Sequence, residues 1–545
     1  MLAKLVENWL DSASELSYQA VFVQILVAKG YRVVHSTRHS ALEYGKDVLA
    51  VAPDGAGCAY QLKGKPGGRL TLAEFRGSIQ DQIIQLMTHA ITYPGFPSGA
   101  HRAFLVSNGY YDEEVHGAIT ALNANVAYPS KVELISRGEL LQDCIDLGEK
   151  LWPSELMQGR LLLEIYLADP KDILPSEKLG VLVGEILKLA PGARAYKSKA
   201  EFERAATSAA LLTGIATAQF AEAENHWAVV SAWTLYATSL VASADRYRFN
   251  LKGVALASLQ LAEETIIRSL LSLWRDVSDR PHLVEGSVIA DAAIYRWRYT
   301  LIVGLLSSLL VYDDDTDLVD ANTREDIERW LDRDHRHLLI WGEGAVPSLV
   351  TWLVWLRSFD PTIKADYRIA GLVSNVIMAN QRDSGRALSG PYDRFDQIWR
   401  RGARIGDWRD ESILSGETHD GSSYCSEALF HMLVRTKLKQ MCRQLWPAFS
   451  HLAHRQVVPE AGWQYGTMHA SRGTEETRIY PTFYEWATMK DEAVGAPGGQ
   501  TDIRMPVELT RRPWLLSLWW QLVPQRFTTS AFRAFADSVL PGWGR

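Results

Sequence analysis

Residues 45–65, GKDVLAVAPDGAGCAYQLKGK, decide how the N-terminal part of this chain is expected to fold. Two short apolar segments flank residues 53–57, which contain the Pro and Gly that tight turns use, so the stretch predicts a β-hairpin. Folding about that turn is expected to place Asp47 opposite Lys63. Because strand side chains alternate between faces, Asp47, Gln61 and Lys63 are expected to share one face of the hairpin.

These three side chains suggest a particular chemistry. A carboxylate and an amide oxygen are ligands that hard cations such as Mg²⁺ accept, and a nearby ammonium group could orient or deprotonate a water molecule. The pattern is therefore typical of a metal-dependent phosphodiesterase. The same residues would also suit an ordinary cross-strand ion pair between Asp47 and Lys63, which contributes little to stability.

The segments on either side of the hairpin favour the first interpretation. Apolar spacing predicts a helix over residues 3–29, with Glu15 in its middle and Gly30 at its end. The other predicted elements are a strand at 31–36, a helix at 71–91, a strand at 103–106, a helix at 111–125, a strand at 132–135 and a helix opened by a capping box at 136–139. This alternation predicts a mixed sheet with helices packed on its faces.

The order of these pieces resembles the PD-(D/E)xK nuclease superfamily, in particular the Mrr-type restriction endonucleases, in which Gln replaces the second acidic residue of the motif. The matching pieces are Glu15, Gly30-Tyr31-Arg32-Val33, Gly45-Lys46-Asp47 and Gln61-Leu62-Lys63, followed by RAFLVSNGYYDEEVHGAITALN and VELISRGELLQ. The resemblance covers residues 1–150. It implies an N-terminal α/β restriction-endonuclease-like domain.

The resemblance also implies a role for each motif residue. Asp47 would be the principal ligand of Mg²⁺ or Mn²⁺, with the Gln61 side-chain oxygen and the Leu62 carbonyl completing the protein's share. Lys63 would position the attacking water and stabilise developing negative charge. Glu15 would be an indirect metal ligand or a partner of Lys63, unless it is a solvated helix residue.

Two groups of basic residues are candidates for contact with a nucleic-acid backbone. Lys65, Arg69 and Arg76 surround the hairpin, and Arg400, Arg401 and Arg404 lie in a loop-rich stretch that also contains aromatic residues. Acidic residues are interleaved with the second group, so ion pairing within the protein is an alternative for it. Since the formal net charge is -7, any DNA binding must come from such local patches.

Composition predicts a soluble protein of more than one domain. The chain has 545 residues, 47% hydrophobic and 22% charged. Only Trp9 of the 19 tryptophans precedes residue 150, which marks a change in composition there. The predicted division is a nuclease domain at 1–150, a helical array for sensing or assembly at 151–385, and a mainly helical region at 386–545 for nucleic-acid or partner contact.

Cysteine usage and apolar segments bear on the compartment. The four cysteines are scattered without the spacing of a zinc site or a disulfide framework, which fits a reducing cytoplasm. The N-terminus lacks the pattern of a signal peptide. Residues 301–311 form an apolar run too short to span a membrane, so a buried helix is expected there and no membrane partner.

The sequence thus predicts a cytoplasmic, Mg²⁺-dependent endodeoxyribonuclease, with restriction of foreign DNA in anti-phage defence as the setting that the resemblance implies. The helical region would regulate it and could form a homo-oligomer or bind a partner defence protein. Two alternatives stay open. The nuclease fold could be a catalytically inactive binding or scaffold module, or the substrate could be RNA.

Overall fold

The computed structural model describes residues 2–36, 46–151, 156–279, 289–311, 319–333, 338–381, 388–393, 398, 421–459, 461–468, 477–481, 485–495 and 505–544. The chain divides into two compact units. The first comprises Met1–Leu240 and Tyr247–Thr265, and the second comprises Val241–Arg246 and Ile266–Arg545.

The first unit is built on a five-stranded mixed sheet of order β1-β2-β3-β5-β7. Its strands are β1 (Arg32–Ser36), β2 (Val48–Val51), β3 (Gly57–Lys63), β5 (Arg102–Ser107) and β7 (Val132–Ile135). The pairs β1/β2 and β2/β3 are antiparallel, whereas β3/β5 and β5/β7 are parallel. The strands β4 (Arg69–Leu70) and β6 (Tyr110–Tyr111) form a separate, short parallel sheet.

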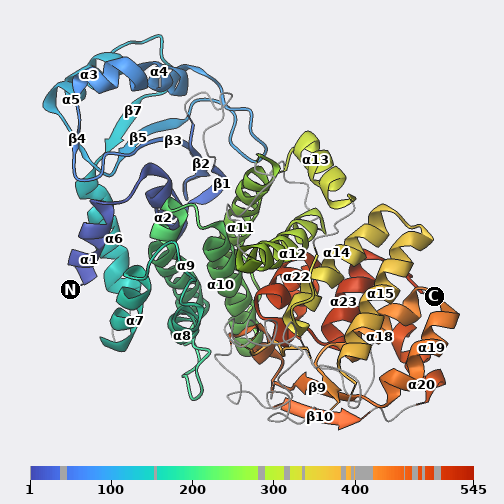
Figure 1. The fold of residues 1–545 in the computed structure, drawn as a ribbon. Coiled ribbons are helices and arrows are strands. Elements are labelled where there is room, and N and C mark those ends of the chain that lie inside the picture. The colour runs from blue at the N-terminus through green and yellow to red at the C-terminus, as the bar shows by residue number, and fades with distance from the viewer. Residues whose placement is uncertain are drawn as a thin grey trace. The chain divides into compact units, whose positions relative to one another are not determined.

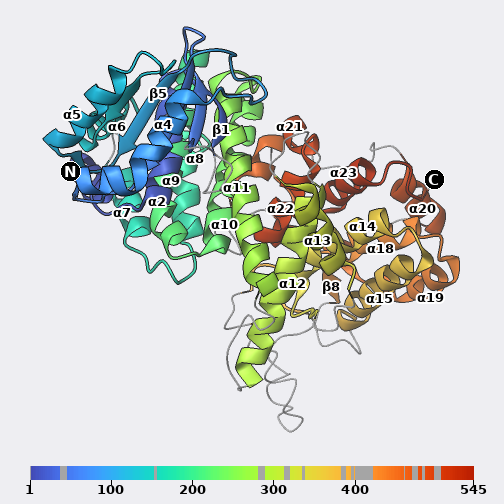
Figure 2. The same ribbon diagram turned by 90° about the horizontal axis from the view of Figure 1, so that it is seen from above.

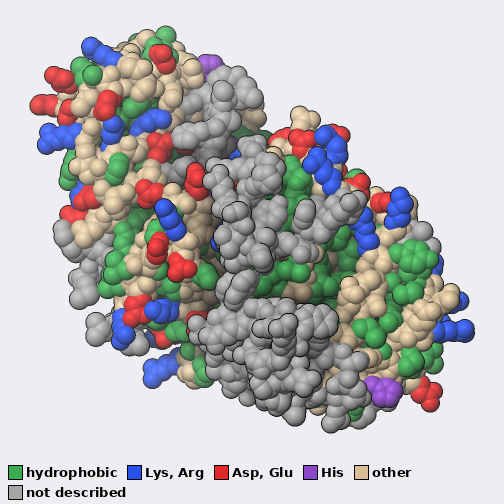
Figure 3. Space-filling model, viewed as in Figure 1, with side chains coloured by type: hydrophobic (Ala, Val, Ile, Leu, Met, Phe, Trp, Pro, Cys, Tyr) green, Lys and Arg blue, Asp and Glu red, His purple; other side chains and the backbone are tan. Residues whose placement is uncertain are grey.

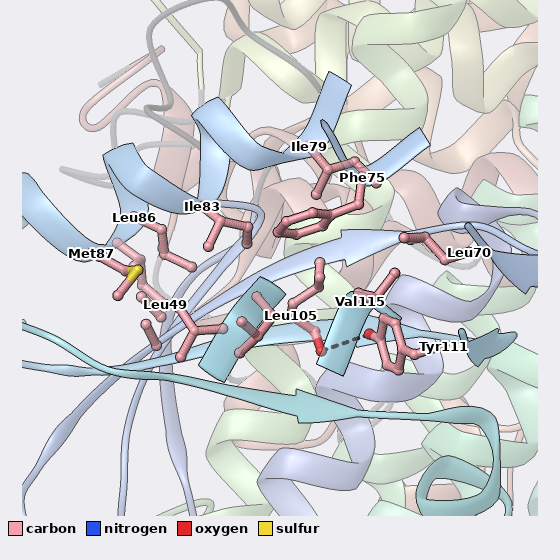
Figure 4. Packing of buried hydrophobic residues seen from close by; sticks show 14 of the residues in the cluster. Leu49, Leu70, Phe75, Ile79, Ile83, Leu86, Met87, Leu105, Tyr111 and Val115 are labelled. Atoms are coloured by element: carbon pink, nitrogen blue, oxygen red, sulfur yellow. Dashed lines mark hydrogen bonds between the residues drawn. The ribbon is translucent and has the colours of Figure 1, made fainter. Parts of the chain in front are cut away.

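Helices cover both faces of the sheet (Figure 1). One face packs against α3 (Leu72–Glu74), a π-helical segment Phe75–Ile79, α4 (Gln80–Thr88) and α5 (Glu113–Asn123). Figure 4 shows its core, in which Leu49, Leu105 and Ile83 are buried together and Tyr111 Oη donates to the Leu105 carbonyl over 2.8 Å. The opposite face packs against α2 (Glu15–Ala28).

Ring contacts fix α2 on that opposite face. The Phe22 ring meets the Tyr60 ring edge-on at 5.2 Å, and Tyr60 stacks on Phe104 at 4.8 Å. The arrangement confirms the coarse expectation of an α/β unit with a mixed sheet. The finer identification of this unit as restriction-endonuclease-like stays a prediction.

Two of the predicted helices differ from those in the structure. The predicted helix at 3–29 is two helices, α1 (Leu2–Leu10) and α2, so Glu15 is the first residue of α2 and does not lie mid-helix. The predicted helix at 71–91 is interrupted by the π-helical segment. The strand at 132–135 has the predicted bounds, and Glu139 Oε2 accepts the backbone N–H of Ser136 over 2.7 Å, which is one half of the expected capping box.

Helices beyond the sheet also belong to the first unit. They are α6 (Arg137–Leu151), α7 (Leu156–Tyr166), α8 (Ser176–Ile186), α9 (Lys199–Glu222), most of α10 (His226–Tyr247) and the start of α11 (Val254–Asp279). The helix α9 packs on α2, and a Cβ added at Gly214 would lie 3.5 Å from Val21 Cγ2, at ordinary van der Waals distance. The unit therefore runs past residue 150, and whether residues 1–150 form a domain alone stays a prediction.

The second unit is mainly helical, as expected for this part of the chain. Besides the end of α11, its helices are α12 (Ile289–Val311), α13 (Ala321–Leu331), α14 (Val346–Phe359), α15 (Ile363–Ala379), α18 (Ser426–Arg435), α19 (Lys439–Ser450), α20 (Trp486–Val494), α21 (Val507–Thr510), α22 (Pro513–Leu522) and α23 (Thr529–Val539). Figure 2 shows them from a second direction. A small sheet of order β10-β9-β8, which the sequence did not predict, joins β8 (Ser422–Ser423), β9 (Ala453–Val457) and β10 (Thr477–Pro481).

Buried apolar helices explain the hydrophobic runs of the sequence. Residues 301–311 lie in α12, where Val303 and Leu305 are fully buried, as predicted for this segment. Among the described residues one helix, His226–Tyr247, is long and apolar enough by composition to cross a membrane, and 89% of its 18-residue window is buried in the protein. Such burial is what the core helix of a folded unit shows.

Candidate active site at the β2–β3 hairpin

The hairpin forms, but its register differs from the prediction. Val48 pairs with Tyr60 and Leu49 with Ala59, and the backbone N–H of Asp47 donates to the Tyr60 carbonyl over 2.8 Å. Asp47 therefore lies opposite Gln61, and the expected pairing with Lys63 is wrong.

The cause is the position of the turn. Ala52 donates to the Ala56 carbonyl over 2.9 Å, so the turn is centred on Asp54 instead of Gly55. Moving the centre by one residue moves each pairing by two. Because side chains alternate with a period of two, Asp47, Gln61 and Lys63 still share one face, as predicted.

The Asp47 carboxylate is buried and accepts two hydrogen bonds. It is 5% exposed, and its Oδ2 accepts the Gln61 Nε2–H over 2.5 Å and the Leu62 backbone N–H over 2.6 Å. The same Gln61 Nε2 lies 3.4 Å from the Leu62 carbonyl oxygen. Two oxygens, from Asp47 and Leu62, thus converge on the position of one amide nitrogen.

The Gln61 amide is only partly satisfied by hydrogen bonds among the described residues. Its side chain is 2% exposed, yet Oε1 has no hydrogen-bond partner among the residues that the structure describes. The two ends of an amide are assigned by their hydrogen bonds and can be exchanged by rotating the group. The exchanged orientation would turn Oε1 toward the Asp47 and Leu62 oxygens, where three acceptors can share a cation but not a hydrogen bond.

These residues therefore fit a hard divalent cation, which prefers oxygen ligands and usually one or two carboxylates. No cluster of three or more His, Cys, Asp and Glu residues able to hold a metal occurs in the described ranges. A cation at the hairpin would depend on one carboxylate together with neutral oxygens. We expect weaker metal binding than in a site with two carboxylates.

Lys63 ends β3 and is half-buried on the same face as Gln61. Its ammonium group has no ion-pair partner within the part of the chain that the structure describes. Its backbone N–H donates to Tyr18 Oη over 3.1 Å, and this hydroxyl lies 3.2 Å from the Val106 carbonyl and 3.3 Å from that of Lys63. Tyr18 therefore bridges β3 and β5 at the point where Lys63 leaves the sheet.

Sequence reasoning missed Tyr18, although it lies one helical turn after Glu15 in α2. It is 1% exposed. Burial raises its pKa well above the ordinary range, and the nearby carboxylates of Glu15 and Asp47 act in the same direction. The hydroxyl consequently keeps its proton and can serve as both donor and acceptor at the end of β3.

Glu15 also reaches the motif. Its Oε2 accepts the backbone N–H of Gly64 over 2.8 Å, so it is bound to the segment that follows Lys63 and is not a purely solvated helix residue. Asn108 is the second neighbour that the sequence did not reveal. It is fully buried, and its Oδ1 accepts the Lys65 backbone N–H over 2.7 Å.

The basic residues predicted to hold DNA have mixed surroundings. Lys65 forms an ion pair with Glu74, whereas Arg69 is 74% exposed with its Nη1 3.9 Å from Asp112. Arg76 is exposed on the π-helical segment. Basic and acidic side chains are interspersed over the visible face of the first unit in Figure 3. The predicted second group, Arg400, Arg401 and Arg404, lies outside the described residues.

Comparison with protein-family models, with curated proteins and with solved structures finds no match for this chain. The resemblance to PD-(D/E)xK nucleases accordingly rests on the motif residues and their order in the chain.

Proposed function

We propose that the first unit is a metal-dependent endodeoxyribonuclease that hydrolyses phosphodiester bonds, with foreign DNA as its substrate and the helical remainder of the chain as its regulator. One observation carries the proposal. The buried Gln61 Oε1 has no partner among the described residues, while oxygens of Asp47 and Leu62 converge on the other end of the same amide. Buried polar atoms without a partner are uncommon in folded proteins, and an unpaired amide oxygen close to a carboxylate is what an empty ligand site would leave.

The chain's own residues divide the work. Asp47, the Gln61 side-chain oxygen and the Leu62 carbonyl would hold a Mg²⁺ or Mn²⁺ ion, which supplies charge compensation for the phosphodiester and makes a water molecule more acidic. Lys63 shares their face and would orient the attacking water and offset charge developing on the phosphate. Tyr18 and Glu15 hold the backbone N–H groups of Lys63 and Gly64 and are positioning residues.

The test compares cleavage by the full chain and its variants. Supercoiled plasmid, linear DNA and RNA are incubated with Mg²⁺ or Mn²⁺ and with wild-type protein, Asp47→Ala or Lys63→Ala. Loss of one preorganised charged group at a transition state typically costs about 10²–10³ in rate, so we expect both variants to lose at least that much DNA cleavage. Circular dichroism checks that the variants remain folded.

Matched controls are available in the same unit. Asp54→Ala removes an exposed carboxylate from the turn of the same hairpin, and Lys171→Ala removes an exposed ammonium group, so both should retain activity. Equal cleavage by wild type, Asp47→Ala and Lys63→Ala would sink the proposal. Cleavage of RNA but not DNA through the same residues would support the ribonuclease alternative.

One observation favours the scaffold alternative. With Nε2 of the Gln61 amide turned towards Asp47, Gln61 donates to the carboxylate over 2.5 Å and satisfies it without a cation. Titration of wild type and Asp47→Ala with Mn²⁺ by calorimetry separates the two functions. Heat of binding that disappears in Asp47→Ala supports the metal site, whereas identical traces together with absent cleavage support an inactive binding module.

A further inference from the structure

A seam of polar side chains joins two helices of the second unit, α18 and α23, which lie side by side in Figures 1 and 2. Each helix contributes three side chains spaced by four residues: Glu427, His431 and Arg435 from α18, and Thr529, Arg533 and Asp537 from α23. A spacing of four residues places side chains on one face of a helix.

The outer two pairs of the seam are joined by hydrogen bonds. Thr529 Oγ1 donates to Glu427 Oε2 over 2.6 Å, and Arg435 Nη1 donates to Asp537 Oδ1 over 2.8 Å. Arg435 lies eight residues after Glu427 in α18, and Asp537 lies eight residues after Thr529 in α23. The two helices therefore run in the same direction, and the remaining pair, His431 and Arg533, lies between the two joined pairs.

The middle of the seam lacks acceptors. His431 is 2% exposed and Arg533 is 5% exposed, yet both ring nitrogens of His431 and Nε of Arg533 have no hydrogen-bond partner among the described residues. Nη2 of Arg435, a residue that is 1% exposed, is likewise without one in those ranges. Three buried side chains thus bring unpaired polar groups to the same part of the interior.

Each of the two arginines also donates one hydrogen bond to the end of α20. Arg435 Nε donates to the Ala493 carbonyl over 2.8 Å, and Arg533 Nη2 donates to the Gly495 carbonyl over 2.9 Å. The C-terminal end of a helix carries partial negative charge, which stabilises neighbouring cations. These contacts hold both guanidinium groups in place and leave Nε of Arg533 and Nη2 of Arg435 without a hydrogen-bond partner among the described residues.

The seam holds two arginines and two carboxylates, Glu427 and Asp537, but only one of the arginines forms an ion pair among the described residues. Asp537 compensates Arg435, but Arg533 has no carboxylate partner in the part of the chain that the structure describes. Burial lowers the pKa of His431 to about 4; the carboxylate of Glu427 opposes this shift, whereas the guanidinium groups of Arg533 and Arg435 add to it. The imidazole is therefore neutral near neutral pH and offers one N–H donor.

We propose that the interior between α18, α20 and α23 is a binding site for a small inorganic anion of the size of chloride, held by Arg533 Nε, Arg435 Nη2 and the His431 ring N–H. Buried unpaired donors cost free energy, and a water molecule could satisfy them as well as an anion. A buried guanidinium group without an ion-pair partner costs more than an unpaired neutral donor, and an anion beside Arg533 would supply the direct partner that a water molecule cannot. The site would stabilise this part of the second unit when it is occupied.

The test measures thermal unfolding of the full chain while gluconate, an organic anion much larger than chloride, is replaced by chloride or bromide at constant ionic strength. A ligand that binds only the folded state raises Tm with the logarithm of its concentration. We expect this rise in wild type and its loss in Arg533→Met and in His431→Phe. Arg357→Met is the matched control, since Arg357 already pairs with Asp366 over 3.2 Å, and should retain the rise.

Equal responses of wild type and Arg533→Met, or no response of either, would overturn the proposal. If Arg533→Met does not fold, wild-type crystals soaked in bromide give the same decision by anomalous scattering. A bromide peak within hydrogen-bond distance of Arg533 and His431 supports the site. An interior without such a peak refutes it.

Discussion

Gly64 shows how a single missing side chain positions the candidate active site. A Cβ at this residue would lie 3.0 Å from the backbone nitrogen of Glu15 and 3.1 Å from its Cβ. Overpacking of a close contact typically costs about 1–3 kcal/mol, so we expect Gly64→Ala to lower the free energy of unfolding by that amount and to push Glu15 away from the motif. Urea unfolding measures the loss.

Gly77 supplies the control for this substitution. It lies in the π-helical segment, and a Cβ there would meet nothing within 4 Å. Since Ala is favoured over Gly inside helices by about 1 kcal/mol, Gly77→Ala should leave stability unchanged or raise it slightly. Equal destabilisation by both substitutions would show that close approach to Glu15 is not the cause.

Individual residues of the hairpin also show which of its features could be predicted from the sequence. The period of two assigned Asp47, Gln61 and Lys63 to one face, because that assignment survives a register error of two residues. The register itself depended on which glycine makes the turn. Gly55 has φ of +83° and serves the turn, whereas Gly57 is a strand residue whose Cβ would lie 2.7 Å from the Phe96 ring. The need for Gly57 comes from a distant residue, so the local sequence could not separate the two.

At the scale of elements, Asn108 explains why the predicted helix at 3–29 is two helices. Its Nδ2 donates to the carbonyls of Leu10 and Ala13 over 3.0 and 2.7 Å, while its Oδ1 accepts the Lys65 N–H. These bonds hold the link between α1 and α2 against the end of the hairpin. Apolar spacing continues through the link, so a contact made 95 residues away in the sequence was invisible to it.

We expect Asn108→Ala to destabilise the first unit strongly. Each buried backbone group left unpaired costs about 1–3 kcal/mol, and this substitution removes the partner of three such groups. Proteolysis at the α1–α2 link should accelerate together with the loss of stability. Gln142→Ala, which removes an exposed amide that bonds Asp146, should change neither quantity. Unchanged protease resistance in Asn108→Ala would contradict this account of the link.

At the scale of the whole chain, composition and contacts answer different questions. The change in tryptophan content at residue 150 marks where the amino-acid usage changes. The boundary between the compact units instead falls near residues 240–266. It lies so late in the chain because α9 packs on α2 and extends the first unit. Sequence patterns identified the sheet and the helical character of the remainder. They could not identify long-range pairs such as His431 with Arg533, which depend on how separate helices align.

Two buried histidines of the second unit, His431 and His454, make the stability of the protein depend on pH. Burial lowers the pKa of His431 from its ordinary value of 6.5 to about 4, and burial also lowers the pKa of His454. Between pH 6.5 and 4 the unfolded chain therefore binds more protons than the folded chain. The contribution of neutral His431 to stability is fully present above pH 6.5 and is lost as the pH falls towards 4.

For His431 this decline is on the order of 3 kcal/mol, since one pKa unit corresponds to about 1.4 kcal/mol. Urea unfolding of the wild type between pH 7 and 4 should show it, and His431→Phe should show a shallower slope because the variant cannot take up that proton. The comparison is made in gluconate, since an anion beside the ring would favour its protonated form and narrow the window. Parallel slopes for the two proteins would mean that His431 is not held neutral in the folded state.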